Sequence, residues 1–216
     1  MAHRKYYNSE GIEIPSVTEI TKLLHKPELD SWANWMGLVR RINVNDYLLE
    51  KSRYGTYCHE LFENFFMGLL TKNSLDHNFV NEDEFSLLIR KLEYIKDQFR
   101  KYDIEVINME LGMDGKRFGG TLDMLAYSKS LHRIFVFDLK TSKSLYQSHL
   151  IQTGGYSLLL EELYGIPVTD VGIILLSKPI GNDMIHIIPR DRNKPNEEIF
   201  NKLVDIYYLQ KGGKIK

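Results

Sequence analysis

Apolar residues recur every three or four positions through most of the first hundred residues, and this spacing predicts a series of helices. Ser16, with Glu19 three residues later, has the form of a capping box, so we expect a helix from there through Leu24. Pro27 suits the first turn of a second helix. The apolar residues of that helix follow at helical spacing: Leu29, Trp32, Trp35, Met36 and Val39.

Two features of the second helix have more than one interpretation. The pair Trp32 and Trp35 is more typical of a core than of a platform for base stacking, and we interpret it as core. Arg40 and Arg41 follow the helix, where they are either its solvated end or contacts for phosphate.

Two longer helices are predicted next, over Asp46–Leu70 and Glu82–Lys101, with a polar loop over Thr71–Asn81 between them. Gly55 lies within the first of these helices. Because glycine inside a helix costs about 1 kcal/mol relative to alanine, it indicates either a helix start or close packing against the backbone. His59 and Glu63 follow it four residues apart, and are therefore neighbours on one surface of the helix.

From Ile104 the pattern changes to that of strands. Ile104–Leu111 is rich in strand formers, Met113–Gly115 is a hairpin signal, and Phe118–Tyr127 is the returning strand. Ile134–Leu139 is a nearly unbroken apolar run, which is typical of a strand that is covered on both faces.

The rest of the chain alternates helices and strands. A helix over Tyr146–Tyr164, ended by Gly165, separates the apolar strand from the next one, over Val168–Leu176, and this favours a parallel crossover. A short strand over Met184–Ile188 and an amphipathic helix over Pro195–Leu209 follow. The pattern therefore predicts one α/β domain over residues 1–216, mainly helical over 1–101, with the sheet and the last helix over 102–216.

The amino-acid composition narrows the possible classes of protein. A chain that is 43% hydrophobic and 26% charged is typical of a globular protein, and its net charge of −1 provides no overall basic signal for nucleic acid. Cys58 is the single cysteine, which excludes an intrachain disulfide and a cysteine-ligated iron–sulfur cluster. The apolar runs are too short to cross a bilayer, and the start of the chain has no signal-peptide or transit-peptide character, so we expect a cytoplasmic protein without a membrane partner.

The candidate chemistry lies on two adjacent predicted strands. Asp138 and Lys140 end an apolar strand and project to the same side, so they are either a strand-end salt bridge or part of a site. Asp123 follows two glycines on the neighbouring strand, where a ligand or another backbone can approach closely. Two carboxylates one strand apart repel each other unless a cation or a proton lies between them. Carboxylates with water are the ligands of Mg²⁺ or Mn²⁺, so the residues indicate metal-assisted hydrolysis.

The motifs then resemble a known family. Gly120-Thr-Leu-Asp123, Asp138-Leu-Lys140 and Gln152-Thr-Gly-Gly-Tyr156 are similar to successive motifs of the PD-(D/E)XK nuclease superfamily, and with Gly55-x-x-x-His59 they resemble its RecB-like branch. The set is especially similar to mitochondrial genome maintenance exonucleases and phage exonucleases. The resemblance covers about Ser16–Ser177. It implies a restriction-endonuclease-like core, a mixed central β-sheet flanked by helices, with an N-terminal helical layer.

The resemblance also implies roles for individual residues. Asp123 and Asp138 would bind the metal and Lys140 would be the catalytic lysine, with His59 as a further metal ligand. Glu63, Glu110, Gln152 and Tyr156 are possible site members, for which a solvated surface or helix packing is the alternative. The expected substrate contacts are Arg117, Thr141, Ser142, Lys143 and His149.

The expected function is that of a Mg²⁺- or Mn²⁺-dependent DNA exonuclease that acts on single-stranded or end-containing DNA. We expect a role in DNA replication, recombination or repair, of the kind that a phage-encoded exonuclease has. Alternatives are a nucleic-acid-binding module on the same fold that does not cleave, and a metal-dependent endonuclease. The presence of Asp123, Asp138 and Lys140 together argues against the first alternative. A sequence-specific endonuclease normally needs a recognition insertion or a dimer interface, and the sequence shows no clear candidate for either.

Overall fold

The described residues of the chain group into two compact units. The computed structural model describes residues 4–24 and 27–212, the side chains of residues 27–30 and 72 excepted. The sheet unit comprises Met1–Leu23 and Leu87–Lys216, and the helical unit comprises Leu24–Ser86. Within the described ranges, no helix combines the length and the apolar character needed to cross a membrane.

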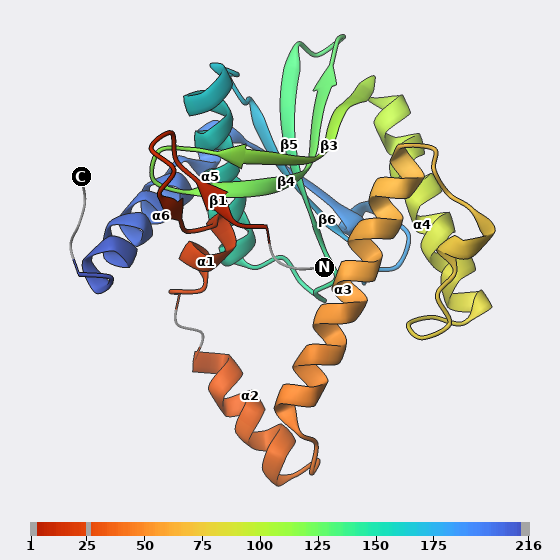
Figure 1. Ribbon diagram of the computed structural model, residues 1–216. Helices are drawn as coiled ribbons and strands as arrows, with labels where there is room; N and C mark the ends of the chain where they lie inside the picture. The colour runs from red at the N-terminus through yellow and green to blue at the C-terminus, as the bar shows by residue number, and fades with distance from the viewer. Residues whose placement is uncertain (1–3, 25–26, 213–216) are drawn as a thin grey trace. The chain divides into compact units, whose positions relative to one another are not determined.

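A five-stranded mixed sheet is the centre of the sheet unit. Its strands follow in sequence order: β3 (Ile104–Asp114), β4 (Gly119–Ser128), β5 (Arg133–Lys140), β6 (Asp170–Leu175) and β7 (Ile185–Pro189) (Figure 1). Neighbouring strands are antiparallel except β5 and β6, which are parallel. This confirms the predicted parallel crossover, because α5 (Gln147–Tyr164) connects these two strands.

Helices flank this sheet. The Phe99 ring of α4 (Glu82–Lys101) packs against Phe137 of β5 with 5.0 Å between the ring centres. α5 packs on the sheet, and α6 (Arg190–Gln210) packs along α5. α5 ends as predicted at Gly165, whose φ of 63° is the left-handed conformation that glycine adopts readily.

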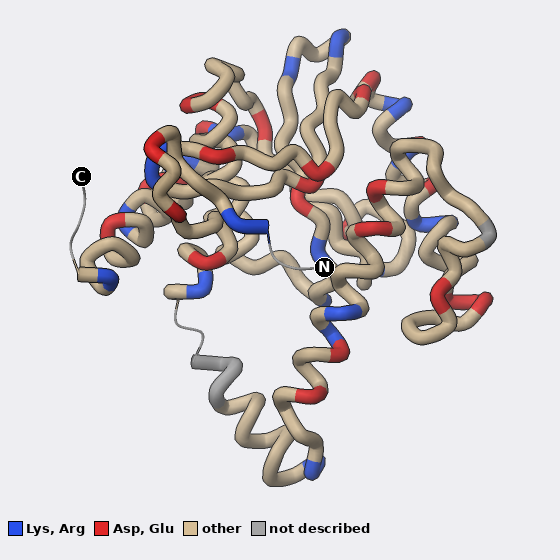
Figure 2. Tube along the Cα trace, viewed as in Figure 1, with Lys and Arg blue, Asp and Glu red and all other residues tan. Residues whose placement is uncertain are grey.

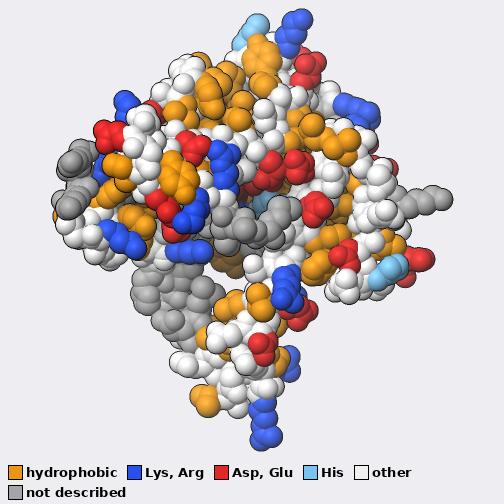
Figure 3. Space-filling view, in the orientation of Figure 1, with side chains coloured by type: hydrophobic (Ala, Val, Ile, Leu, Met, Phe, Trp, Pro, Cys, Tyr) orange, Lys and Arg blue, Asp and Glu red, His pale blue; other side chains and the backbone are white. Residues whose placement is uncertain are grey.

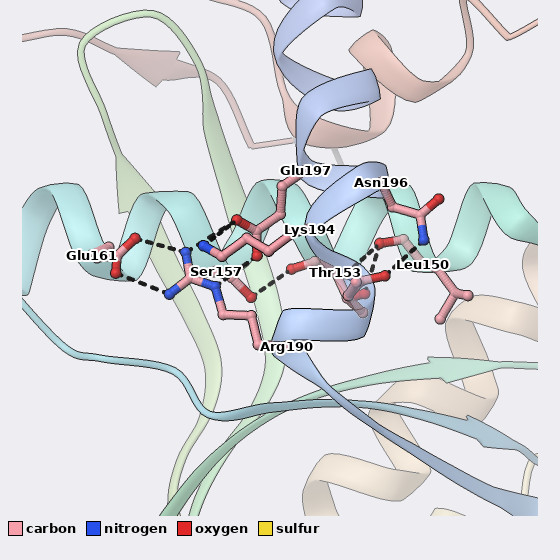
Figure 4. A network of polar contacts seen from close by, with 9 residues as sticks. Leu150, Thr153, Ser157, Glu161, Arg190, Lys194, Asn196 and Glu197 are labelled. Carbon is pink, nitrogen blue, oxygen red and sulfur yellow. Dashed lines mark hydrogen bonds and ion pairs between the residues drawn. The ribbon is translucent and has the colours of Figure 1, made fainter.

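The last helix begins earlier than its sequence predicts. Pro195 lies inside α6, not at its start, because α6 begins at Arg190. Arg190 is buried and its guanidinium donates to Glu197 and to Glu161 of α5, as Figure 4 shows. These contacts hold the first turn in place, and Pro195, which cannot donate a backbone hydrogen bond, lies in the second turn.

A short hairpin and a short helix precede the sheet. β1 (Tyr6–Tyr7) pairs with β2 (Glu13–Ile14), and the sequence predicted neither strand. α1 (Val17–Thr21) has the predicted capping box, since Ser16 Oγ accepts from the Glu19 amide at 3.0 Å. The helix ends at Thr21, three residues before the predicted end.

The helical unit contains α2 (Pro27–Leu38), α3 (Val44–Phe66), the 3-10 turn η1 (Lys72–Ser74) and the start of α4. Gly55 lies in the interior of α3, so it does not mark a helix start. The buried face of α3 is Tyr57, Cys58, Leu61 and Phe62. The core interpretation of Trp35 is wrong, because this side chain is 47% exposed. Val39 is also exposed, and the Leu29 side chain lies outside the described residues.

Candidate active site

Three neighbouring strands bring three carboxylates into one row. Met109 pairs with Met124 and Leu111 with Leu122, so Glu110 on β3 lies opposite Asp123 on β4. The β4–β5 pairing extends to Met124 opposite Phe137, and Asp123 and Asp138 are the next residues of these two strands. Carboxylate oxygens of Glu110 and Asp123 lie within 4.8 Å of each other. Figure 2 shows acidic positions on these adjoining strands.

The two aspartates are buried and each has a compensating donor. Asp123 is 7% exposed and Asp138 is 1% exposed. The Leu139 backbone amide donates to the Asp123 carboxylate at 2.6 Å, and Lys140 Nζ lies 2.6 Å from an Asp138 oxygen. Buried carboxylates are costly unless such partners offset the loss of water. The ion pair is the strand-end salt bridge expected as one alternative, and it lies in the same row as a second buried carboxylate.

Glu110 has an unusual backbone conformation for a strand residue. Its φ is 48°, in the left-handed region, although it lies within β3. A non-glycine residue held in this region stores about 1–3 kcal/mol of strain. β3 is also irregular between Val106 and Asn108, where the pairing register shifts. The backbone of β3 around Glu110 therefore departs from regular strand geometry.

The glycines before Asp123 admit two aromatic rings. A Cβ on Gly120 would lie 2.8 Å from the Tyr156 ring, and one on Gly119 would lie 2.6 Å from the Tyr6 ring. The sequence predicted close approach of a ligand or a backbone at these positions. The approach of a backbone is confirmed at Gly119, whose amide donates to the Pro15 carbonyl at 3.0 Å, and side chains from α5 and β1 pack against these glycines as well.

Tyr156 is close to the buried aspartates. Burial raises its pKa well above 10, and the negative charges of Asp138 and Asp123 raise it further. Gln152 Nε2 donates to the Tyr156 hydroxyl at 3.0 Å, so these two predicted site members form one pair on α5. The phenol remains neutral at ordinary pH and keeps its proton available for hydrogen bonding.

The carboxylate row fits a hard divalent cation. Glu110, Asp123 and Asp138 offer only oxygen ligands, which Mg²⁺ and Mn²⁺ prefer. Two of these carboxylates are buried, where a bound cation offsets the cost of their charge. The donor set therefore suits a hard divalent cation.

The residues after β5 have structural contacts of their own. His149 is buried near the start of α5, where its Nδ1 accepts from the Tyr146 amide at 3.4 Å. Ser142 Oγ donates to the Ser144 carbonyl at 3.0 Å, and the Ser142 carbonyl accepts from Ser177 Oγ. Lys143 is exposed and Thr141 is half-buried. Of these predicted substrate contacts, only Lys143 has a largely open side chain.

Arg117 is held by α6. Its guanidinium lies 2.8 Å from Asp205 and over the Tyr208 ring, 5.5 Å from the ring centre. The Tyr208 hydroxyl donates to the Arg117 carbonyl at 2.6 Å. Arg117 therefore links the β3–β4 turn to α6, and the structure does not bring it into the carboxylate row.

His59 and Glu63 belong to the helical unit. Both are half-buried on α3, one turn apart, as the sequence predicts. Their assignment to the site rests on the sequence motif.

Sequence reasoning did not identify Lys91 as part of the support for this region. This buried lysine of α4 donates from Nζ to the Leu176 carbonyl at 2.6 Å. The Leu176 amide in turn donates to the Lys140 carbonyl at 2.9 Å. A lysine at a core position of an amphipathic helix was the available signal, since buried lysines need a partner.

Comparisons with known proteins give no family for the chain. No protein-family model matches it, and no curated protein matches it. Among solved structures 22 chains match, and one of them is described as the crystal structure of SSO0001. That chain is 15% identical, with a TM-score of 0.27, over 53% of this chain and 57% of that one. The match thus spans little more than half of either chain, and a likeness this small carries no argument about function.

Proposed function

We propose that this protein is a Mg²⁺- or Mn²⁺-dependent deoxyribonuclease with a restriction-endonuclease-like core, acting as an exonuclease on single-stranded or end-containing DNA. The observation that carries the proposal is the pair of buried carboxylates, Asp123 and Asp138, on adjacent strands, with Lys140 ion-paired to Asp138. The resemblance of their motifs to RecB-like nucleases supports the same chemistry.

In this proposal Asp123 and Asp138 hold the cation, and Glu110 adds an oxygen ligand from the opposite side of Asp123. His59 is a further ligand that the sequence motif supports. A bound divalent cation supplies activation of water and neutralisation of phosphate charge. Lys140 offsets charge on the scissile phosphate and orients the water.

Neighbouring groups keep these side chains in position. The Leu139 amide donates to one oxygen of Asp123 and so holds this carboxylate in position. Gln152 donates to Tyr156, and the neutral phenol is a donor for a carboxylate or a phosphate oxygen. This arrangement favours hydrolysis of a phosphodiester over simple binding, because binding alone does not require two buried carboxylates.

The proposal is tested with end-labelled linear and closed circular single-stranded DNA in Mg²⁺, in Mn²⁺ and in EDTA. We expect metal-dependent loss of the linear DNA, and a fall of at least about 100-fold in rate for Asp138→Asn, since a metal ligand is lost. Asp97→Asn is the matched control, because Asp97 is 67% exposed in a surface ion pair on α4.

Each of these measurements tests one part of the proposal. Cleavage of the circle would make the enzyme an endonuclease. An Asp138→Asn variant with native activity would refute the assigned site. Binding of DNA without cleavage in either metal would favour the non-cleaving module. His59→Ala tests the motif-based ligand, and unchanged metal dependence in that variant would remove His59 from the site.

A further inference from the structure

The corner between α2 and α3 carries exposed apolar side chains. We define the helical corner as residues Ser31–Arg53. In α2 and the turn after it, Trp35 is 47% exposed, Leu38 82% and Val39 62%. At the start of α3, Leu48 and Leu49 are 49% and 52% exposed. Figure 3 shows apolar and basic side chains together on this part of the molecule. Such a surface typically marks a binding site.

Aromatic rings and cations alternate across this corner. The Arg40 guanidinium lies over Trp35, 5.4 Å from the ring centre, and Lys51 Nζ lies over Tyr47 at 5.3 Å. The Trp32 and Tyr47 rings join the two helices, with 5.6 Å between their centres. Because Trp32 and Trp35 are one turn apart on α2, the two pairs form one stripe of rings and cations.

The corner is also locally basic. It contains four Lys and Arg residues but two Asp and Glu residues, whereas the whole chain has a net charge of −1. Figure 2 shows basic positions at the turn and farther along α3, with acidic positions between them. Opposite charge therefore favours an anionic partner here.

The turn holds its basic residues in a defined position. Arg41 has a φ of 54°, a left-handed conformation that is costly for a side chain other than glycine. The Ile42 amide donates to the Met36 carbonyl at 3.1 Å, and the Asn43 side chain caps α3 by accepting from the Asn45 amide at 3.0 Å. Arg40 and Arg41 are thus both exposed at an ordered turn.

We propose that the helical corner binds single-stranded nucleic acid, with bases stacked on Trp35 and phosphates at Arg40, Arg41 and Lys51. Single strands expose base faces for stacking beside charged phosphates, and a stripe of rings and cations matches both. A duplex hides its base faces, and a purely apolar partner would leave the cations without charged partners. The choice of DNA as the strand rests on the proposed nuclease function.

The test uses the full chain in EDTA, so that no cleavage is required. The two tryptophans of the chain, Trp32 and Trp35, both lie in the corner, and their fluorescence reports directly on it. Titration with single-stranded oligothymidine is expected to quench this fluorescence, and to do so more weakly as salt rises. An abasic strand of the same length should bind more weakly, because it lacks bases to stack.

Variants assign the contacts. Arg40→Ala with Arg41→Gly should weaken binding at least tenfold, and glycine keeps the left-handed turn at position 41. Trp35→Ala should weaken binding by a similar factor, while Trp35→Phe, which retains a ring, should recover part of it. Arg100→Ala with Lys101→Ala is the matched control, since these residues are also adjacent, basic and exposed, and its affinity should be native. Circular dichroism of each variant confirms that its helices are formed.

Several outcomes would overturn the assignment. Native affinity in the Arg40 and Arg41 variant, equal quenching by blunt duplex DNA, or equal affinity for the abasic strand would each do so. Binding to anionic vesicles without quenching by DNA would assign the corner to a lipid surface, and self-association abolished by Leu38→Ser would assign it to a second copy. If DNA quenches the fluorescence as expected but no cleavage occurs with metal, the strand-binding proposal holds and the nuclease proposal fails.

Discussion

The two buried aspartates differ in what compensates their charge. Asp123 accepts a hydrogen bond from a backbone amide, which a side-chain substitution cannot remove, whereas Asp138 is paired with the ammonium of Lys140. Loss of Lys140 would leave Asp138 buried without that cation, so a Lys140 variant would change both charge balance and chemistry. Lys140→Arg separates these effects better than Lys140→Ala, because it retains the charge.

Among single residues, substitution of Gly120 tests how tightly the Tyr156 ring is packed. A Cβ there would lie 2.8 Å from the Tyr156 ring and 3.0 Å from Val17, and both neighbours are buried. We expect Gly120→Ala to lower the free energy of unfolding by about 1–3 kcal/mol, measured by urea denaturation. Gly37→Ala is the control: its Cβ meets nothing within 4 Å in exposed α2, so stability should be unchanged or higher by up to about 1 kcal/mol. Equal stability of Gly120→Ala and the native protein would contradict the tight packing.

The raised pKa of Tyr156 predicts that the stability of the folded state depends on pH. Its pKa is raised well above 10 by burial and by the charges of Asp138 and Asp123. Above about pH 10 the unfolded chain loses this proton while the folded chain keeps it, so the folded state binds more protons and stability falls as pH rises. Tyr156→Phe should therefore show a shallower fall of melting temperature above about pH 10.

The comparison at lower pH is the control for that variant. There Tyr156→Phe should differ only by the lost hydrogen bonds of the hydroxyl with Gln152 and Thr18, each of which contributes about 1 kcal/mol. An alkaline slope identical to that of the native protein would mean that Tyr156 does not contribute to it.

Among the elements, α5 and α6 are joined by a buried ionic cluster (Figure 4). Arg190 Nε lies 2.6 Å from Glu197, and its Nη2 lies 2.6 Å from Glu161. Hydrogen bonding from Arg190 lowers the pKa of Glu161, so this contribution is present above the ordinary carboxyl pKa and is lost as pH falls through the lowered value. The cluster explains why α6 starts at Arg190 and why it packs along α5.

Removal of the Arg190 charge tests this cluster. Arg190→Met would leave Glu197, which is 4% exposed, with Lys194 as its remaining cation at 3.1 Å. We expect a loss of about 3–5 kcal/mol in the free energy of unfolding, and recovery of most of it when Glu197→Leu is added. Lys5→Ala breaks an exposed pair with Glu13 and should leave the free energy of unfolding nearly unchanged, because water screens that pair. A loss for Arg190→Met no larger than for Lys5→Ala would contradict the buried-pair interpretation.

At the scale of the whole molecule, the proposed chemistry and the proposed strand-binding surface belong to different units. The carboxylate row and Lys140 lie in the sheet unit, and the aromatic–cation stripe lies in the helical unit. Cleavage and binding can therefore be measured with separate variants. This separation is what makes the nuclease proposal and the strand-binding proposal independently testable.

The sequence by itself determined the elements whose signals are local. α4 has the predicted bounds and Gly165 ends α5, whereas β3 continues to Asp114, so the hairpin turns over residues 115–118, slightly later than the predicted Met113–Gly115. The parallel pairing of β5 and β6 also followed from the sequence, because a helix connects two apolar strands. These features depend on periodicity, caps and turn residues, which are readable within a few positions of each other.

Only the tertiary structure decided which distant residues meet. The alignment of Glu110 with Asp123, the Tyr156 ring over Gly120, and the start of α6 at Arg190 all depend on partners far away in the chain. Trp35 has the spacing of a core residue yet is exposed, because helical spacing specifies a face but not what covers it. The residue types of the candidate site were legible in the sequence, whereas their burial, strain and compensation depend on strand register and packing.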